Sequence, residues 1–370
     1  MSSDVRKKSN TVLVIGAGPA GLSAAIEAAE NGADCLVLEH MAEPLQKLLI
    51  TGNGRCNFSN TDLSPSHYHG DPELLGSVLS GFSCDDMLDY MADTLGVEAL
   101  EAHYRFSENG YFYPSTNKAA TVRDALLKKC KDTGVRIFTS CTVKEVKKEE
   151  DGGFLVRTLL PRGETVFPCD RVIFATGSNA HPETGSDSSI YKVLMSLGVT
   201  FHTFLPALCA IRSKDPVLTE LKGLRCDGSA RLCDDTEGTF YESDPGEIQF
   251  NPGSVSGLPV MNLSGQCAEG FAGGHEMRLR LTLTKVNNKK GVSVPPEIVL
   301  RVTGTDGFPK CQCCRGGVDA AEIDPGTLMY RKIPGIYFAG ELIDVDGECG
   351  GYNLHFAFAT GIRAGRSAAR

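Results

Sequence analysis

The stretch "TVLVIGAGPAGLSAAIEAAENGADCLVLE", residues 11–39, restricts the fold of this chain more than any other. Its apolar run from Val12 to Ile15 is typical of a buried parallel strand. The alanines that follow recur at helical spacing, and "DCLVLE" predicts a second buried strand that ends in an acid. The stretch therefore predicts a strand–helix–strand unit, and with it an α/β fold with a parallel sheet.

Three glycines stand between the first strand and the helix in the spacing G-x-G-x-x-G. Gly16 permits a tight turn, Gly18 lets a pyrophosphate approach the backbone, and Gly21 lets the helix pack closely on the strand. Glu39 ends the second strand, where a carboxylate can accept hydrogen bonds from an adenosine ribose. The pattern predicts a dinucleotide site and favours FAD or NAD over NADP, whereas a purely structural glycine-rich turn is the alternative.

Two later segments bear on the choice between FAD and NAD. "CDRVIFATG" predicts a strand that ends at Ala175-Thr176-Gly177, and "GIYFAGELIDVDGECGGYNLHFAFATG" predicts a strand, then Gly340-Glu341, then a helix of small residues. Both resemble two-dinucleotide-binding-domain flavoproteins, in which the late acid binds the ribityl or pyrophosphate region and the helix N-terminus faces the flavin. In such proteins the hairpin predicted around 140–158 places an amide, here near Val143, against the adenine; a plain surface hairpin is the alternative. The resemblance favours FAD.

Five further segments carry a more specific resemblance. "KLLITGNGRCNFSN", "NGYFYPST", "GEIQFNPGSVSGLPVMNLSG", "RGGVDAAEIDPGTL" and the late glycine-rich segment resemble the aminoacetone-oxidase-like (BaiN-like) FAD-dependent oxidoreductases over most of the chain. The resemblance implies a Rossmann-like FAD domain split across the sequence, with an inserted β-barrel-like substrate domain. It also implies a small-molecule substrate, with the flavin reduced by that substrate or by transiently bound NADH or NADPH, or reoxidised by oxygen.

The patterns and the resemblance together predict a set of cofactor-binding residues. These are Gly16, Gly18, Pro19, Ala20, Gly21, Glu39, Lys47, Gly52, Asn53, Gly54, Arg55, Cys56, Asn57, Val143, Ala175, Thr176, Gly177, Gly340, Glu341, Asp344, Gly350, Gly351, Tyr352 and Asn353. Lys47 is as well explained as a solvated surface lysine. No catalytic residue is assigned: His355 and Tyr352 are candidates near the flavin's pyrimidine end, and a structural role in the helix is the alternative for His355.

The fourteen cysteines of this long chain are scattered through apolar segments, which favours reduced thiols and a cytoplasmic protein. Cys56 has no second cysteine at C-x₂-C or C-x₄-C spacing, so a redox-active disulfide is not expected there. Cys311 and Cys314 have C-x₂-C spacing, but no second ligand pair accompanies them and no metal is predicted. That run is interpreted as an ordinary strand.

The chain divides into three predicted segments: residues 10–180 for the first part of the FAD domain, 181–315 for a mostly-β insertion, and 316–370 for the return. Family members carry a long helical segment between the insertion and the "GGV" element. Here Leu279, Leu281 and Leu283 alternate with polar residues, a strand pattern, and Pro295-Pro296 opposes a helix. The helical segment is therefore predicted to be deleted. A flavin-binding protein with reduced or no activity is the resulting alternative function.

The net charge of −9 disfavours a nucleic-acid partner, and with it the tRNA-modifying flavoproteins of related fold. The glycines and the proline of the first apolar run divide it into strand, turn and helix, and no later run reaches membrane-spanning length, so no membrane association is predicted. The sequence does not indicate an oligomeric state.

Overall fold

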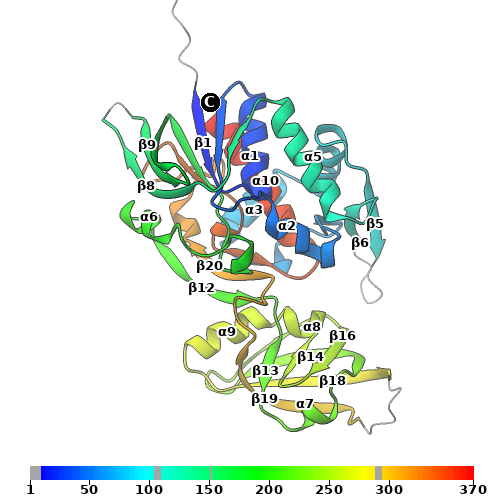
Figure 1. Ribbon diagram of the computed structural model, residues 1–370. Coiled ribbons are helices and arrows are strands. Elements are labelled where there is room, and N and C mark those ends of the chain that lie inside the picture. Colours follow the sequence, from blue (N-terminus) through cyan, green and yellow to red (C-terminus); the bar gives the residue numbers. More distant parts are fainter. Residues whose placement is uncertain (1–9, 104–109, 151, 288–293) are drawn as a thin grey trace, which may run out of the picture.

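The computed structural model describes residues 10–103, 110–150, 152–287 and 294–370, which form an upper α/β unit and a lower β unit (Figure 1). The upper unit contains a five-stranded parallel sheet of order β21-β11-β1-β2-β7. Its strands are β1 (Thr11–Ile15), β2 (Asp34–Leu38), β7 (Arg136–Phe138), β11 (Arg171–Phe174) and β21 (Ile336–Phe338). The predicted α/β class is thus confirmed, and the last strand joins the sheet from the far end of the sequence.

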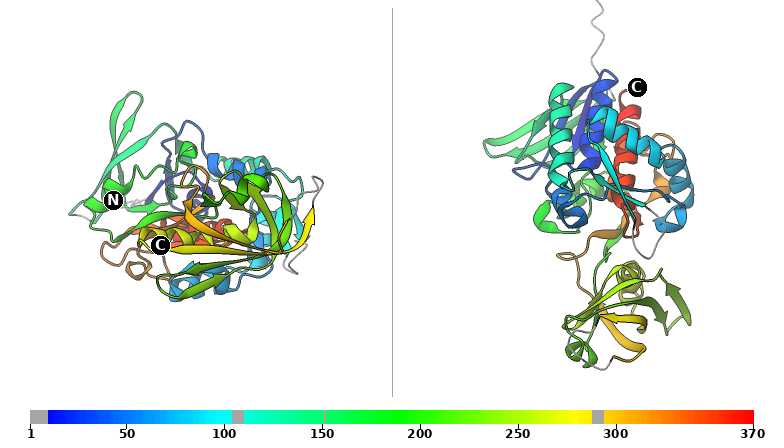
Figure 2. Two further views of the ribbon diagram at one scale, coloured as in Figure 1. Left: turned by 90° about the horizontal axis from the view of Figure 1, so that it is seen from below. Right: turned by 90° about the vertical axis from the view of Figure 1, so that its right-hand side faces the viewer.

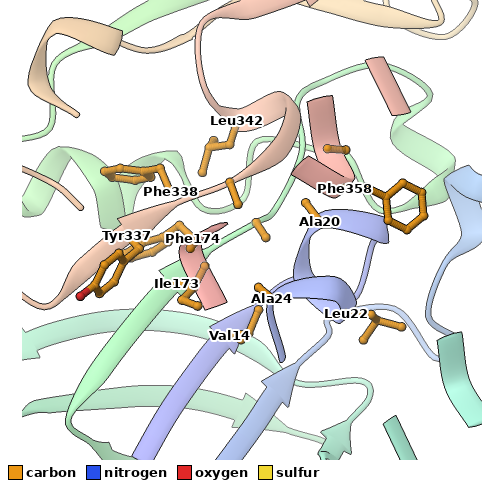
Figure 3. Close-up of a cluster of buried hydrophobic side chains, with 14 of the residues drawn as sticks. Val14, Ala20, Leu22, Ala24, Ile173, Phe174, Tyr337, Phe338, Leu342 and Phe358 are labelled. Carbon is orange, nitrogen blue, oxygen red and sulfur yellow. The ribbon is translucent and has the colours of Figure 1, made fainter. Parts of the chain in front are cut away.

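Two helices of small residues pack against this sheet. They are α1 (Pro19–Glu30) and α10 (Tyr352–Ala368). A Cβ on Gly361 would lie 2.3 Å from the carbonyl oxygen of Ala20, and one on Gly365 would lie 2.2 Å from that of Ala24. The two helices therefore cross at backbone contact, which only glycine permits at these positions. Apolar side chains such as Phe174, Phe338 and Phe358 fill the space around them (Figure 3).

The rest of the upper unit surrounds this sheet and its helices. The predicted hairpin is present as β8 (Thr142–Lys148) and β9 (Phe154–Leu160), extended by β10 (Gly163–Cys169); Asp151 of its predicted turn lies outside the described residues. The other helices are α2 (Gln46–Ile50), α3 (Pro72–Ser80), α4 (Cys84–Asp89), α5 (Ala119–Asp132) and α6 (Tyr191–Ser196). The short strands are β3 (Ser59–Asn60), β4 (Tyr68–Gly70), β5 (Ala99–His103), β6 (Gly110–Pro114) and β22 (Val345–Gly347).

The lower unit is a closed, barrel-like sheet. Its strand order is β15-β14-β16-β17-β13-β19-β18, and β18 pairs back onto β14, which closes the ring. The strands are β13 (Ile211–Ser213), β14 (Arg225–Asp234), β15 (Thr239–Glu242), β16 (Gly246–Asn251), β17 (Ser254–Ser256), β18 (Met277–Asn287) and β19 (Glu297–Thr305). Helices α7 (Val217–Glu220), α8 (Leu258–Met261) and α9 (Ser264–Ala272) accompany them. The predicted β-barrel-like insertion agrees with this architecture.

Two antiparallel strands lie where the units meet, β12 (Phe201–Ala207) and β20 (Cys313–Val318), and the barrel forms a separate body below them (Figure 2). The barrel has its own apolar core, which extends from Ile211 to Val302. Residues 181–207 contribute instead to the core of the upper unit, through side chains such as Val193 and Phe204. The residues of the barrel core therefore span a shorter part of the sequence than the predicted insertion, residues 181–315.

The interval expected to lack the family's helix is a pair of antiparallel strands. Strand β18 pairs with β19 from Arg278 to Thr282, which confirms the strand predicted from the alternating leucines. Residues 288–293 lie outside the described part, and the described residues between His275 and Cys314 contain no helix. In the described part of the chain, no helix combines the length and apolar character needed to cross a bilayer.

Candidate functional site

A groove runs along the ends of β1, β2 and β11, where the predicted cofactor residues gather. One section has an empty volume of about 890 Å³ and the adjoining section about 600 Å³. Both sections are lined by Gly16, Glu39, Thr176 and Gly177, so they form one continuous space. Other predicted residues that line it are Gly18, Pro19, Ala20, Lys47, Val143, Ala175, Gly340, Glu341 and Asn353.

The glycine-rich turn connects β1 to helix α1 and lines the groove. Gly16 has φ of +103°, and a Cβ there would lie 2.5 Å from the carbonyl oxygen of Ala175. A Cβ on Gly21 would lie 1.9 Å from the carbonyl oxygen of Gly16, so this glycine serves packing, while Gly18 has open space. No side chain in the described part of the chain caps the helix at Gly18. The first amides of α1 are therefore free to bind an anionic group.

Glu39 closes one side of the turn. Its carboxylate accepts hydrogen bonds from the backbone N–H groups of Ala17 and Met41, both at 2.8 Å. These bonds fix the carboxylate beside the groove and leave lone pairs for ribose hydroxyls. Within the described residues, the buried hydroxyl of Thr176 has no hydrogen-bond partner, which indicates a polar ligand at this point. The turn, the acid and this hydroxyl all fit a dinucleotide.

Lys47 and Glu341, predicted separately, meet in the groove across 294 residues of sequence. The Lys47 Nζ lies 2.5 Å from Glu341 Oε2, and both side chains are largely buried. Burial lowers the pKa of Lys47, but the charge and hydrogen bond of Glu341 outweigh it, so the lysine stays protonated. Ser178 donates to Glu341 Oε1 at 2.7 Å. The groove thus holds a fixed cation next to a fixed anion.

The Thr51–Asn60 stretch has an unusual backbone but lies beside the groove. Gly52, Asn53, Gly54 and Cys56 all have positive φ, with values of 55°, 57°, 81° and 62°. Arg55 stacks over the ring of Tyr113, 4.5 Å from its centroid. Among the described residues that line the groove, Thr51 belongs to this stretch, whereas residues 52–57 are absent. Their predicted cofactor contact remains a prediction.

Cys56 is fully buried, and burial raises its pKa to about 12. The thiol is therefore protonated and unreactive at neutral pH. This observation agrees with the expectation that Cys56 does not act as a redox partner.

The N-terminus of α10 approaches the groove through Asn353 and Leu354. Gly351 has φ of +97°, and a Cβ there would lie 2.5 Å from the carbonyl oxygen of Ser59. Gly350 accepts a hydrogen bond from Asn60. Asp344 accepts hydrogen bonds from Gly316 N and from His202. Gly350, Gly351 and Asp344 thus hold neighbouring loops, and none of them is among the described residues that line the groove.

The two candidate catalytic residues lie in different surroundings. His355 is fully buried, with one ring nitrogen 3.0 Å from Ser59 Oγ and the other 3.0 Å from the carbonyl oxygen of Phe82. Burial lowers its pKa to about 4, so it is neutral, and these contacts favour the structural alternative. Tyr352 stacks on His67 at 4.9 Å between ring centroids. The hydrogen bond to Glu348 raises the pKa of His67, the ring that stacks on Tyr352.

Sequence reasoning missed several residues that line or support the groove: Gln46, Ser178, Ser186 and Gln312. Ser178 directly follows the Ala-Thr-Gly turn, and this position could have identified it as a groove residue. Gln312 lies within the cysteine run that was interpreted as an ordinary strand. Among the described residues, no group of three or more His, Cys, Asp or Glu is arranged to hold a metal ion.

The family described as "HI0933-like protein Rossmann domain" matches residues 10–367. This chain belongs to that family. The family is the BaiN-like flavoprotein family of oxidoreductases, so the resemblance carried by the glycine-rich segments is confirmed.

Curated relatives align over nearly the whole chain. It is 33% identical to the 3-dehydro-bile acid delta(4,6)-reductase of Clostridium scindens, over 97% of this chain and 99% of the relative. It is 26% identical to the ribosomal RNA dihydrouridine synthase of Escherichia coli, over 94% of this chain and 95% of that protein. The first alignment spans 419 positions, whereas this chain has 370 residues, so the relative contains segments without counterpart here.

Solved structures share the fold. The 3-ketosteroid delta1-dehydrogenase of Sterolibacterium denitrificans matches with a TM-score of 0.60 at 12% identity, over 98% of this chain and 100% of that one. The 3-ketosteroid-delta4-(5alpha)-dehydrogenase of Rhodococcus jostii matches with a TM-score of 0.53 at 17% identity, over 100% and 99%.

Proposed function

We propose that this chain is an FAD-dependent oxidoreductase that adds or removes hydrogen at a carbon–carbon bond next to a carbonyl in a small cyclic molecule, with NADH or NADPH as the external reductant. The observation that carries the proposal is the continuous groove. It joins the uncapped start of α1, the Glu39 carboxylate and the Lys47–Glu341 pair in a chain that belongs to a flavoprotein family. FAD supplies a ring that accepts and donates a hydride.

The residues of the groove would hold that cofactor in sections. Glu39 would accept hydrogen bonds from the adenosine ribose, and the amides at the start of α1 would bind the pyrophosphate. Lys47, Glu341 and Ser178 would bind the phosphate and ribityl region, where a fixed charge pair offers both a donor and an acceptor. The first amides of α10, at Asn353 and Leu354, would stabilise negative charge on the ring.

The substrate class rests on what the relatives' names describe. A delta(4,6)-reductase acts on carbon–carbon double bonds of a 3-dehydro steroid, and dihydrouridine is uridine with a ring double bond saturated next to a carbonyl. Both names describe hydrogen addition to a conjugated double bond. We infer the same bond type for this chain and favour a free small molecule over RNA, because the net charge of −9 opposes binding to a polyanion.

A second candidate is a flavin-binding protein with little or no catalysis. Two observations favour it: the alignment of 419 positions exceeds the 370 residues of the chain, and β18 pairs directly with β19 where a helical segment is expected. We propose that this segment is the missing part. A substrate would then be less enclosed by protein and more exposed to water, which slows hydride transfer.

One experiment separates these functions. The purified chain is mixed with FAD, freed of excess cofactor, and its visible spectrum is recorded before and after anaerobic addition of NADH or NADPH. We expect flavin absorbance that bleaches with a nicotinamide and returns when a cyclic enone is added. Absence of bound flavin contradicts both candidates. Bound flavin that neither nicotinamide reduces, and whose chemically reduced form no enone or uridine-containing RNA reoxidises, supports the second.

A further inference from the structure

Three neighbouring cysteines flank Gln312, a residue that lines the groove. All three are fully buried: Cys311 lies just before β20, and Cys313 and Cys314 are its first two residues. The side chains of Cys311 and Cys314 are hydrogen-bonded to each other, although an extended strand would hold residues three apart far from one another. The chain bends at Gln312, between these two cysteines, before β20 begins. This bend brings the two sulfur atoms together.

Cys314 contacts the groove through the charge pair described above. Its backbone N–H donates to Glu341 Oε1 at 3.0 Å, and its sulfur is hydrogen-bonded to Ser178. Ser178 also donates to the same Glu341 oxygen, at 2.7 Å. The neighbouring Gln312 lines the groove itself. A movement of Cys314 would therefore lengthen or break its hydrogen bond to Glu341.

The pKa values of Cys311 and Cys314 are shifted in opposite directions. Burial and the negative charge of Glu341 raise the pKa of Cys314, but the hydrogen bond from Cys311, the contact with the Ser178 hydroxyl and the positive charge of Lys47 outweigh them and leave the pKa below the ordinary value. The hydrogen bond to Cys314 and burial both raise the pKa of Cys311. Burial raises the pKa of Cys313 as well. A thiol with a lowered pKa next to a second thiol is the arrangement from which a disulfide forms most readily.

We propose that Cys311 and Cys314 are a redox-active dithiol, and that its oxidation to a disulfide weakens the hold of Glu341 on the cofactor. Hydrogen peroxide is a sufficient oxidant. The Cys314 thiolate attacks one peroxide oxygen and releases hydroxide, which gives a sulfenic acid. The Cys311 sulfur then displaces the sulfenic oxygen as water. The two thiols together lose two electrons and two protons, and the peroxide becomes two water molecules.

A disulfide requires the two sulfurs to approach to about 2.05 Å, closer than any hydrogen bond between them. Cys314 must therefore shift toward Cys311, and its N–H moves away from Glu341. Glu341 keeps its hydrogen bonds to Lys47 and Ser178, so we expect the effect of an ordinary rather than a charged hydrogen bond, which is FAD binding weaker by roughly 3- to 10-fold. This second half of the proposal rests on the proposed function, whereas disulfide formation does not.

The test of the dithiol uses peptide mapping of the full chain. Trypsin cleaves after Lys310 and Arg315 and releases the peptide Cys311–Arg315, which contains the three cysteines. The chain is reduced, treated with hydrogen peroxide, alkylated and digested. We expect this peptide to lose two hydrogen atoms and carry one alkyl group, on Cys313, and to regain three alkylation sites after dithiothreitol. Three alkylated cysteines after peroxide, a disulfide that includes Cys313, or an irreversible sulfinic acid contradicts the proposal.

Matched variants separate the two halves. Cys313→Ser should keep the disulfide, and Cys311→Ser should lose it; if Cys311→Ser does not fold, the wild type and Cys313→Ser suffice. FAD titrations then compare oxidised and reduced protein. Weaker binding after oxidation, in the wild type and in Cys313→Ser, supports the coupling, and equal affinity overturns it. Failure of both forms to bind FAD contradicts the proposed function and leaves the peptide map to decide on the disulfide.

Discussion

The upper unit and the barrel are both built on β-sheets, yet they differ in how they bury charged side chains. The apolar core of the barrel extends from Ile211 to Val302, and the buried carboxylate of Asp234 lies at the end of β14, paired with His275. The upper unit buries His355, Arg315 and Asp346, and a lysine and a glutamate meet in its groove. Buried polar groups cost stability unless they are paired. We propose that the upper unit, in which buried charges lie close to the groove, holds the site, and that the barrel supports it.

The largest expected effect tests glycine packing in both units. Gly21→Ala would place a Cβ 1.9 Å from Gly16 O, and Gly228→Ala would place one 2.3 Å from Thr282 O in the barrel. Each should lower the free energy of unfolding by about 2–4 kcal/mol, measured by urea denaturation. Gly21→Ala should also abolish FAD binding in a titration, and Gly228→Ala should leave it within about twofold. Equal loss of FAD binding in both variants would contradict the assignment of the site to the upper unit.

The second effect concerns pH. The folded pKa of His355, about 4, lies below the ordinary value of about 6.5, so the folded state binds fewer protons. Its stabilising contribution is fully present above about pH 6.5 and is lost as the pH falls toward 4. We expect a loss of roughly 3 kcal/mol, seen by hydrogen exchange as opening of α10 while the barrel strands stay protected. His355→Gln should flatten this dependence; an unchanged dependence would show that other groups cause it.

A third comparison sets the groove ion pair against a surface pair of the barrel. Lys47→Met leaves Glu341 without its cation in a largely buried position, whereas Arg231→Met breaks an exposed pair with Glu242. We expect Lys47→Met to weaken FAD binding by about 10- to 100-fold, as the loss of a charged hydrogen bond predicts. Arg231→Met should cost less than about 1 kcal/mol of stability and leave FAD binding unchanged. Similar FAD affinities in the two variants would remove Lys47 from the site.

The smallest effect concerns two buried cysteines, Cys56 beside the groove and Cys267 in the barrel core, whose pKa values burial raises to about 12. Serine at either position buries a hydroxyl and should cost about 1–3 kcal/mol of stability. Neither substitution should change the rate of flavin reduction by NADH or NADPH. A rate that falls with Cys56→Ser alone would restore a chemical role to that thiol.

The sequence predicted the groove where its residues are close together in the chain. The turn at Gly16–Gly21 and the acid Glu39 belong to one strand–helix–strand unit, so a local pattern suffices to place them. The pairing of Lys47 with Glu341 joins residues 294 positions apart, and no local pattern carries that information. Closure of the barrel by β14 and β18 is likewise a non-local contact. The bend between Cys311 and Cys314 was not predicted because this run was interpreted as an ordinary strand, whereas β20 begins only at Cys313.

The most direct test of the central claim is an FAD titration of the wild-type chain followed by anaerobic reduction with NADH and with NADPH. The groove predicts one FAD per chain, with Glu39→Ala and Lys47→Met weakening binding and Arg231→Met leaving it unchanged. It also predicts bleaching of the bound flavin by at least one nicotinamide. A chain that carries no flavin after incubation with FAD and removal of the excess would contradict the account. Equal FAD affinity in the wild type and all of these variants would contradict it as well.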